Sequence, residues 1–386
     1  MTGRIAPILI RSACCGLWLG FALASIPPVA ADSGSRAALA QVAEEADWPR
    51  LQSLLEEQAD TQALQALVAA RQVDGMTALH WAAYHDNLPT VELLLKHGAD
   101  AKGTNRYGIT PLSLACVNGN AEMIAALLKA GADPNASLRG GETPLMTAAR
   151  TGRAAAVKVL LEAGAQVEAH DRRGQTALMW AAADGHVAAV DLLIGAGADL
   201  HARLKSGFTP LLFAAREGRM AVVQRLLEGG VDVNQAIVTE RGGGKAPVKG
   251  TSALILAIEN GHFELAAALL DAGADPNDQR TGFTPLHTLT WVRKPNRGDG
   301  DDGLPPPTGS GKLTSLELVR KLVQRGALVN AQLAKGHAGG GRLGMKGATP
   351  FLLAAKTADV PYLRLLVELG ADPLLPNALP LGTFAC

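Results

Sequence analysis

The apolar and polar positions between Thr143 and Gly174 predict two short helices followed by a polar turn. This stretch reads TPLMTAARTGRAAAVKVLLEAGAQVEAHDRRG. Its apolar positions, which follow the i, i+3, i+4 spacing of one helix face, are Leu145, Ala148 and Ala149 in the first helix and Val157, Leu160 and Leu161 in the second. Gly152 and Gly164 stand where the two helices should end. Helices this short cannot bury their apolar faces alone, so the unit must pack against others.

The same pattern returns at a fixed interval along the chain. Thr followed by Pro or Ala and then Leu begins at Thr77, Thr110, Thr143, Thr176 and Thr209, and each step is 33 residues. The Thr hydroxyl can accept a hydrogen bond from a backbone N–H at a helix start, and Pro suits the first helical position. A constant period of this length predicts a stack of repeated helix pairs.

These motifs resemble the ankyrin repeat, a 33-residue unit with the signature T-P-L-H-x-A. Thr284-Pro285-Leu286-His287 matches its first four letters, and Gly-Ala-Asp recurs at the unit ends, for example at Gly131-Ala132-Asp133. The resemblance implies an all-α solenoid that binds another protein and has neither catalytic residues nor a cofactor. It also implies that His80 and His287 bridge neighbouring loops, and we interpret His186 and His262 as structural in the same way.

The period divides the chain into about nine units. Residues 32–76 form a degenerate N-terminal capping repeat and a linker, with seven extra residues within Thr61–Asp74. Five regular repeats follow over 77–251, with an inserted loop at 239–250 and hairpin-like tips between units. Residues 252–348 hold two repeats with insertions at about 292–312 and 333–347, and residues 349–386 hold the final repeat and an irregular tail. Because the final repeat has no capping helix, we expect its end to be truncated or covered by a partner.

Residues 1–31 differ from the rest and predict a secretory signal peptide. Arg4 and Arg11 precede a run without charge from Ser12 to Ala31, with a short apolar centre and small residues at its end. We predict cleavage after Ala31 and export, with the bacterial periplasm as the expected compartment. The alternative is an uncleaved segment that tethers a structural adaptor to the membrane.

Composition narrows the function classes. The 386 residues contain 36 Lys and Arg and 36 Asp and Glu, so net charge favours neither nucleic acid nor an acidic partner. No His, Cys and carboxylate cluster has metal-ligand spacing, and no nucleophile, base and acid set can be assembled. We therefore expect no enzyme activity, no metal, no cofactor and no small-molecule substrate, with an enzyme site in the long loops as the weakest alternative. A monomer is expected.

Two sets of residues are candidates for binding a partner protein. Residue types vary from unit to unit at the seventh and eighth positions after each unit start, which should lie on the concave face. The members of this first set are Tyr84, His85, Asn118, Arg150, Asp184, Arg216, Glu217 and Trp291. Tyr, Trp and Arg are the types that contribute most to binding energy. Trp81, Trp180 and Phe213, at another shared position, are interpreted as packing residues.

The second set is a basic row at the hairpin tips. Its members, each 33 residues from the next, are Arg106, Arg139, Arg172 and Lys205. Such a row could attract an acidic partner. The alternative is that these side chains only keep the tips solvated, with Asp171 and Glu142 partly neutralising them.

Overall fold

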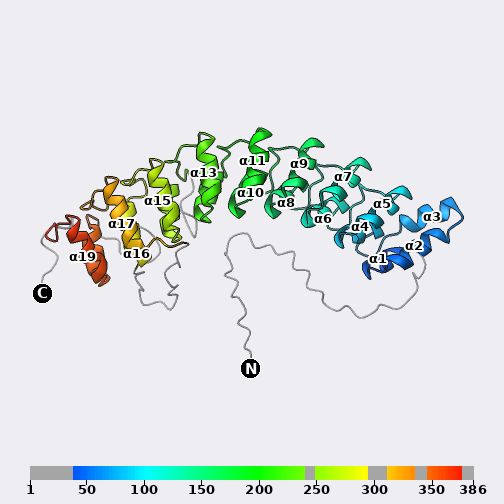
Figure 1. Cartoon of the computed structure of the whole chain (residues 1–386), viewed down its shortest axis with the longest axis horizontal. Coiled ribbons are helices and arrows are strands. Elements are labelled where there is room, and N and C mark those ends of the chain that lie inside the picture. The colour runs from blue at the N-terminus through cyan, green and yellow to red at the C-terminus, as the bar shows by residue number, and fades with distance from the viewer. Residues whose placement is uncertain (1–37, 240–247, 294–310, 335–345, 376–386) are drawn as a thin grey trace, which may run out of the picture.

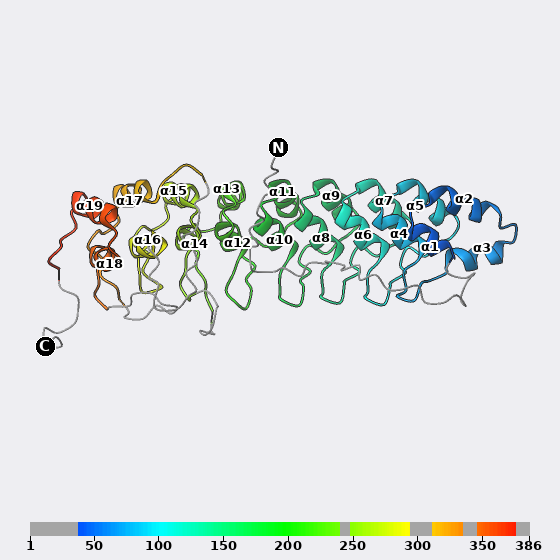
Figure 2. The same cartoon turned by 90° about the horizontal axis from the view of Figure 1, so that it is seen from below.

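The computed structural model describes residues 38–239, 248–293, 311–334 and 346–375, and this part of the chain forms nineteen helices and no named strand. The predicted signal peptide and most of the three predicted insertions lie outside the described residues. The helices form two parallel rows that curve into an arc (Figure 1), and loops project from one side of the stack (Figure 2). The chain is thus an all-α repeat solenoid.

The inner row of the arc contains the first helix of each unit (Figure 1). These helices are α1 (Ala38–Glu44), α4 (Ala78–Tyr84), α6 (Pro111–Asn118), α8 (Pro144–Thr151), α10 (Ala177–Asp184), α12 (Pro210–Arg216), α14 (Ala253–Glu259), α16 (Pro285–Arg293) and α18 (Pro350–Lys356). The second helices are α2 (Trp48–Glu56), α5 (Leu88–Lys96), α7 (Ala121–Lys129), α9 (Ala154–Glu162), α11 (Val187–Gly195), α13 (Met220–Glu228), α15 (Phe263–Asp271), α17 (Ser315–Gln324) and α19 (Val360–Glu368).

The start and end of each first helix follow from local chemistry. At α8 the Thr143 hydroxyl accepts a hydrogen bond from the Met146 N–H over 3.3 Å, and Pro144 occupies the first turn. The helix ends at Gly152, whose φ of +72° is in the left-handed region that favours glycine. The repeated Thr-Pro-Leu motif is therefore a helix-capping device.

A continuous apolar core runs between the two rows. Leu145 and Ala148 of α8 and Val157 and Leu160 of α9 are almost completely buried, and equivalent residues of neighbouring units pack against them. The core extends from Leu39 through to Ala371. Because each helix pair is covered by its neighbours, burial is shared along the stack and not gathered at one centre.

The N-terminal end departs from the expected linker. A third helix, α3 (Thr61–Val68), follows α2 where the sequence pattern predicted extra residues between units. Asp60 is the N-cap of this helix, because its carboxylate accepts a hydrogen bond from the Ala63 N–H over 2.8 Å. Val68 is buried against the core, so the added helix covers part of the first unit.

The C-terminal units are joined by a buried ion pair. Arg293, at the end of α16, donates from Nε and Nη2 to both carboxylate oxygens of Asp359 over 2.8 and 2.9 Å. Its third nitrogen, Nη1, donates to the Ser315 hydroxyl over 2.6 Å. The guanidinium also lies over the Tyr362 ring, whose hydroxyl donates to the Leu286 carbonyl over 2.9 Å. These contacts connect α16, α17 and α19.

A glycine at a tip, Gly207, and a glycine that follows a second helix, Gly164, together test how closely neighbouring tips approach each other. Gly164 and Gly207 have nearly the same φ, +84° and +87°. An added Cβ at Gly207 would lie 2.6 Å from the Val238 carbonyl oxygen, whereas one at Gly164 would meet nothing within 4 Å. We expect Gly164→Ala to cost about 1 to 2 kcal/mol for the left-handed backbone. Gly207→Ala should cost roughly 1 to 3 kcal/mol more, because backbone must move.

Urea unfolding of the two glycine variants, followed by circular dichroism, measures this difference. Equal losses of stability would show that the tips move apart easily to admit the methyl group.

Candidate protein-binding surface

An exposed aromatic cluster lies at the N-terminal end of the inner face. Tyr84 is 52% exposed, and its ring packs edge-on against His85 and Trp81 at centroid distances of 5.1 and 5.7 Å. Trp81 Nε1 donates to the Gln72 amide oxygen over 2.7 Å, and His85 Nε2 lies 3.1 Å from the Glu44 carbonyl oxygen. Neighbouring groups therefore hold these rings in place while Tyr84 stays open to solvent. Trp81, which the sequence pattern assigned to packing, belongs to the same cluster.

The end of α6, in the next unit along the inner face, presents an apolar side chain and an amide. Val117 is 46% exposed. Asn118, a predicted binding residue, donates from Nδ2 to the Ala83 and Tyr84 carbonyls over 2.9 and 3.1 Å. Because these bonds cap the end of α4, the amide of Asn118 has a structural task beyond any contact with a partner.

Arg150 and Asp184 follow on α8 and α10. The Arg150 guanidinium lies 5.5 Å from the Trp180 ring centroid, which is within cation–π distance. Asp184 is exposed at the end of α10. Neither side chain forms an ion pair among the described residues. Arg150 is half-buried, and desolvation by burial raises the pKa of the Asp184 carboxyl, although His186, Arg219 and Arg150 oppose this shift.

Arg216 and Glu217 are engaged with their own surroundings. The Arg216 Nε lies 2.8 Å from a Glu217 carboxylate oxygen, and both side chains are 22% exposed. The guanidinium also lies over the rings of Phe208 and Phe213, at 5.1 and 5.2 Å from their centroids. The charges of this pair largely cancel, which leaves less for a partner to recognise.

Trp291 does not lie on the exposed inner face, and its predicted exposure was wrong. The side chain is 9% exposed and its ring packs edge-on against Phe283 at 4.9 Å. Leu333 and Ala348, which come from the chain beyond α17, pack into the same small cluster. Residues between α17 and the start of the final unit therefore cover a position that is open in the regular repeats.

The basic row lies on exposed tips. All four of its side chains are exposed. The Arg106 guanidinium donates to the Val73 carbonyl, and the Arg139 guanidinium donates to the Arg106 carbonyl, in each case one repeat earlier. Two of the four thus also connect successive tips.

The histidines have the bridging role that the family resemblance implied. His80 Nδ1 lies 2.8 Å from the Thr77 hydroxyl and accepts from the Thr77 N–H, while Nε2 lies 3.1 Å from the Ile109 carbonyl oxygen of the next unit. His287 repeats this arrangement with Thr284 and Ala348. Burial lowers the pKa of each imidazole to about 4, so both are neutral near pH 7.

His186 and His262 are also structural, but they make a different contact. Each lies over a glycine of the preceding unit and bonds through Nε2 to a carbonyl there, His186 to Arg150 over 2.9 Å and His262 to Arg216 over 3.0 Å. An added Cβ at Gly152 would lie 2.4 Å from His186 Nδ1. The glycine in the middle of the repeat therefore also makes room for the next unit.

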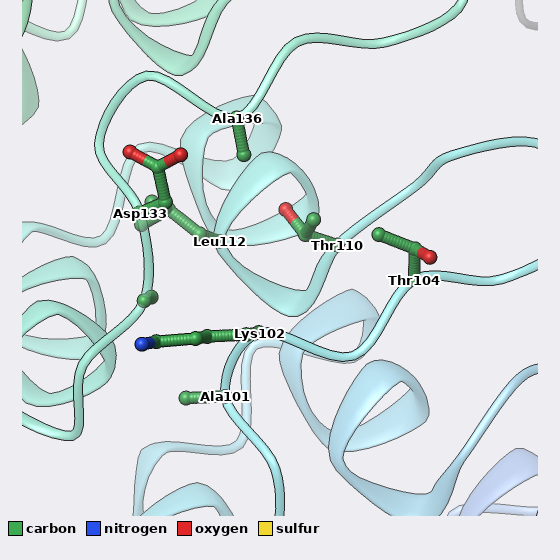
Figure 3. A pocket seen from close by; sticks show the side chains of 8 residues that line it. Ala101, Lys102, Thr104, Thr110, Leu112, Asp133 and Ala136 are labelled. Atoms are coloured by element: carbon green, nitrogen blue, oxygen red, sulfur yellow. The ribbon is translucent and has the colours of Figure 1, made fainter.

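The hollows between units are small or open. Figure 3 shows a cavity of about 210 Å³, lined by Ala101, Lys102, Thr104, Thr110, Leu112, Ala132, Asp133 and Ala136. It is smaller than usual small-molecule sites, which begin at about 300 Å³. A larger open cleft of about 780 Å³ runs beside His170 and Glu168. Within the described ranges no group of three His, Cys, Asp or Glu could hold a metal ion.

None of the helices in the described part of the chain combines the length and the apolar character needed to cross a bilayer.

Comparison with known protein families agrees with this architecture. The model for ankyrin repeats in three copies matches residues 39–138 and 135–204, and the model for the single ankyrin repeat matches residues 206–237 and 249–280. No curated protein matches the chain. Ankyrin repeats are generally protein–protein interaction modules, and proteins built from them are typically non-enzymatic scaffolds. With more than half of its length matched, and with the capped helix pairs and bridging histidines described above, the chain belongs to the ankyrin repeat family.

Proposed function

We propose that this chain is a non-enzymatic scaffold that binds a partner protein through the inner face of its arc. The observation that carries the proposal is that several side chains are exposed on the first helices, whose other residues are mostly buried. Tyr84 and Val117 are half exposed on α4 and α6, and Arg150 of α8 rests on Trp180 of the adjacent unit. Rigid helices hold these groups, so little ordering is needed on binding.

Site-specific photo-crosslinking in the producing cell tests which face binds. A photoreactive residue at position 84 or 117 on the inner face should give a discrete higher-mass adduct. The matched controls are Lys129 and Lys158, exposed on the outer helices α7 and α9, which should give none. Adducts only from the outer positions would place the partner on the wrong face and overturn the proposal.

Substitution of the same face gives a quantitative test. Once the crosslinked partner is identified, Tyr84→Ala and Arg150→Ala should each weaken its binding about 10-fold or more, since exposed Tyr and Arg are frequent binding hot spots. Arg216→Ala should have a smaller effect, because Glu217 already neutralises that charge. Isothermal titration calorimetry measures both, and an unchanged dissociation constant for Tyr84→Ala and Arg150→Ala would contradict the proposed face.

We further propose that the scaffold is exported and acts in a bacterial periplasm. The order of basic residues, short apolar centre and small residues in 1–31 supports this. N-terminal sequencing of the mature protein should begin at Asp32. A chain that begins at Met1 and sediments with membranes would support the tethered adaptor instead.

A further inference from the structure

The tips that carry the basic row form a rigid line. Arg106 N donates to the Asp74 carbonyl over 2.8 Å, and Arg172 N donates to the Gly140 carbonyl over 3.0 Å. An added Cβ at Gly141 would lie 3.1 Å from the Arg172 nitrogen, so there is little room between these tips. A backbone bond therefore joins the tips of Arg139 and Arg172, and the Arg139 guanidinium joins its own tip to that of Arg106.

The cations of this line have no carboxylate partner among the described residues. None of the row's members, Arg106, Arg139, Arg172 and Lys205, forms an ion pair there. The guanidiniums of Arg106 and Arg139 are held by the preceding tip through one donor each, which leaves their other N–H groups available. Their geometry is set before any ligand arrives.

The two acidic residues expected to neutralise the row in part, Asp171 and Glu142, form no ion pair with its cations among the described residues. Asp171 is 5% exposed, and its Oδ1 accepts from the backbone N–H groups of Arg173 and Gln175, both over 2.8 Å. Glu142 is half-buried and makes no ion pair in the described part of the chain. Within the described ranges, neither acid therefore forms an ion pair with a cation of the row.

The outer face of the same stack is organised differently. There, charges pair across units. Asp191 of α11 pairs with Arg225 of α13, and Asp271 of α15 pairs with Lys321 of α17 over 2.6 Å. Part of the charge on the outer face is thus matched within the chain, whereas none of the four cations of the row forms an ion pair among the described residues, so an acidic partner could complement them.

The spacing of the row selects a conformation for that molecule. Packed helices lie about 8 to 10 Å apart, so successive cations recur at about that interval. A polyproline II segment has three residues per turn and rises about 3.1 Å per residue, which returns the same face every 9 Å or so. A β-strand returns it about every 6.7 Å, which does not fit. Tyr107, 48% exposed beside Arg106, offers an aromatic surface on which proline can pack.

We propose that the basic tip row binds an extended acidic segment of a partner protein, with a carboxylate at every third residue. This inference rests on the proposed scaffold function and names the chemistry of the partner. The inner face would then bind a folded part of the partner while the tips hold its extended acidic segment.

Fluorescence anisotropy with synthetic peptides tests the assignment. The probe is a labelled peptide of four Glu-Pro-Pro units, and the comparison peptide has the same composition with its glutamates in adjacent pairs. The full chain should bind the first peptide at least about 5-fold more tightly than the second. Binding should weaken as salt is raised from about 0.05 to 0.3 M, because the contacts are exposed.

Variants with equal loss of charge distinguish the contribution of the row to peptide binding from the contribution of net charge. Replacing the four row residues with Gln should weaken peptide binding at least about 10-fold. The double variant Arg172→Gln with Lys205→Gln keeps both tip-to-tip guanidinium bonds and should still lose several-fold. Removing four charges from the outer helices, through Lys96→Gln, Lys129→Gln, Lys158→Gln and Arg364→Gln, should change binding less than 2-fold.

Three results would overturn the inference: no binding by the unmodified chain, equal binding of the two peptides, or equal losses in the row and outer-helix variants. Tighter binding of a single-stranded oligothymidylate of equal charge would assign the row to nucleic acid and overturn it as well. Each of these outcomes leaves the crosslinking result at the inner face unaffected, so the scaffold proposal stands or fails separately.

Discussion

Replacing Asp359 with Ala is expected to lower the stability of the C-terminal repeats by about 3 to 5 kcal/mol, which is the usual loss when one partner of a buried ion pair is removed. Asp359 is 1% exposed, and its carboxylate accepts hydrogen bonds from Nε and Nη2 of Arg293. Its carboxylate also accepts from the Tyr362 N–H over 3.3 Å and so caps α19. The variant loses the cap and leaves a guanidinium without its counter-charge in a mostly buried place.

The stack itself provides the control. Glu368 of α19 pairs with Arg320 of α17 over 3.0 Å, but both side chains are more than half exposed, so Glu368→Ala should cost less than about 1 kcal/mol. Hydrogen exchange of amides in α18 and α19 measures both losses locally, since an end unit of a solenoid can open without the rest. Equal protection in the two variants would show that the buried pair contributes no more than a surface one.

A charge-free replacement distinguishes loss of the pair from loss of packing. Arg293→Met combined with Asp359→Leu removes both charges and keeps similar volume, and such exchanges are often neutral or stabilising. Only the missing cap of α19, worth about 1 kcal/mol, should remain as a loss. If the double variant is as unstable as Asp359→Ala, the hydrogen bonds to Ser315 and α19 matter more than the buried charge.

The regular part of this architecture could be predicted from the sequence because each helix pair has residues of the same kind at its capping, packing and helix-ending positions. Thr143 caps, Leu145 packs and Gly152 ends the helix within one 33-residue window, and each task depends on neighbours in that window. The structural role of His80 was implied by the resemblance to the ankyrin repeat. Periodicity therefore identified the fold, the two rows and the inner face.

Features that depend on long-range contacts could not be predicted in this way. Arg293 and Asp359 are 66 residues apart with inserted segments between them. Asp359 caps α19 as Asn87 and Asn120 cap α5 and α7, but nothing in the repeated pattern pairs this position with Arg293. Trp291 occupies the same position in its unit as Tyr84, but Leu333 and Ala348 cover it. The sequence pattern identifies a residue's place within a unit, whereas burial at the irregular end depends on where the inserted segments return.

The N-terminal helix α3 shows the same limit for local signals. Asp60 followed by a run of good helix formers is a helix start that could have been found, but the period assigned these residues to a linker. Among the candidate binding residues, Arg216 and Glu217 were predicted as separate contacts and instead pair with each other. Side chains one residue apart can meet across a helix end, which positional variation alone does not reveal.

Acidification from pH 7 to pH 4 is expected to destabilise the stack through His80 and His287. Burial lowers the pKa of each imidazole to about 4, against 6.5 in the unfolded chain, so the unfolded state takes up protons first as pH falls. Their stabilising contribution is complete above about pH 6.5, decreases as pH falls toward 4, and changes no further below it. Each histidine should account for up to roughly 3 kcal/mol across this range.

Another unit of the chain has a residue without a titrating ring at the position of these histidines. In the unit that begins at Thr110, Ser113 occupies the equivalent position and its hydroxyl accepts from the Thr110 N–H over 3.0 Å, so the capping function survives without a titrating ring. His80→Ser with His287→Ser should lower stability at pH 7, because the bonds to Ile109 and Ala348 are lost. The same variant should lose most of the decrease in the free energy of unfolding between pH 6.5 and 4, as measured by urea unfolding at a series of pH values.

His262, whose pKa is also lowered by burial, would account for a small remaining dependence on pH. A full slope in the double variant would mean that other groups take up the protons and that the two bridges tolerate a charged imidazole.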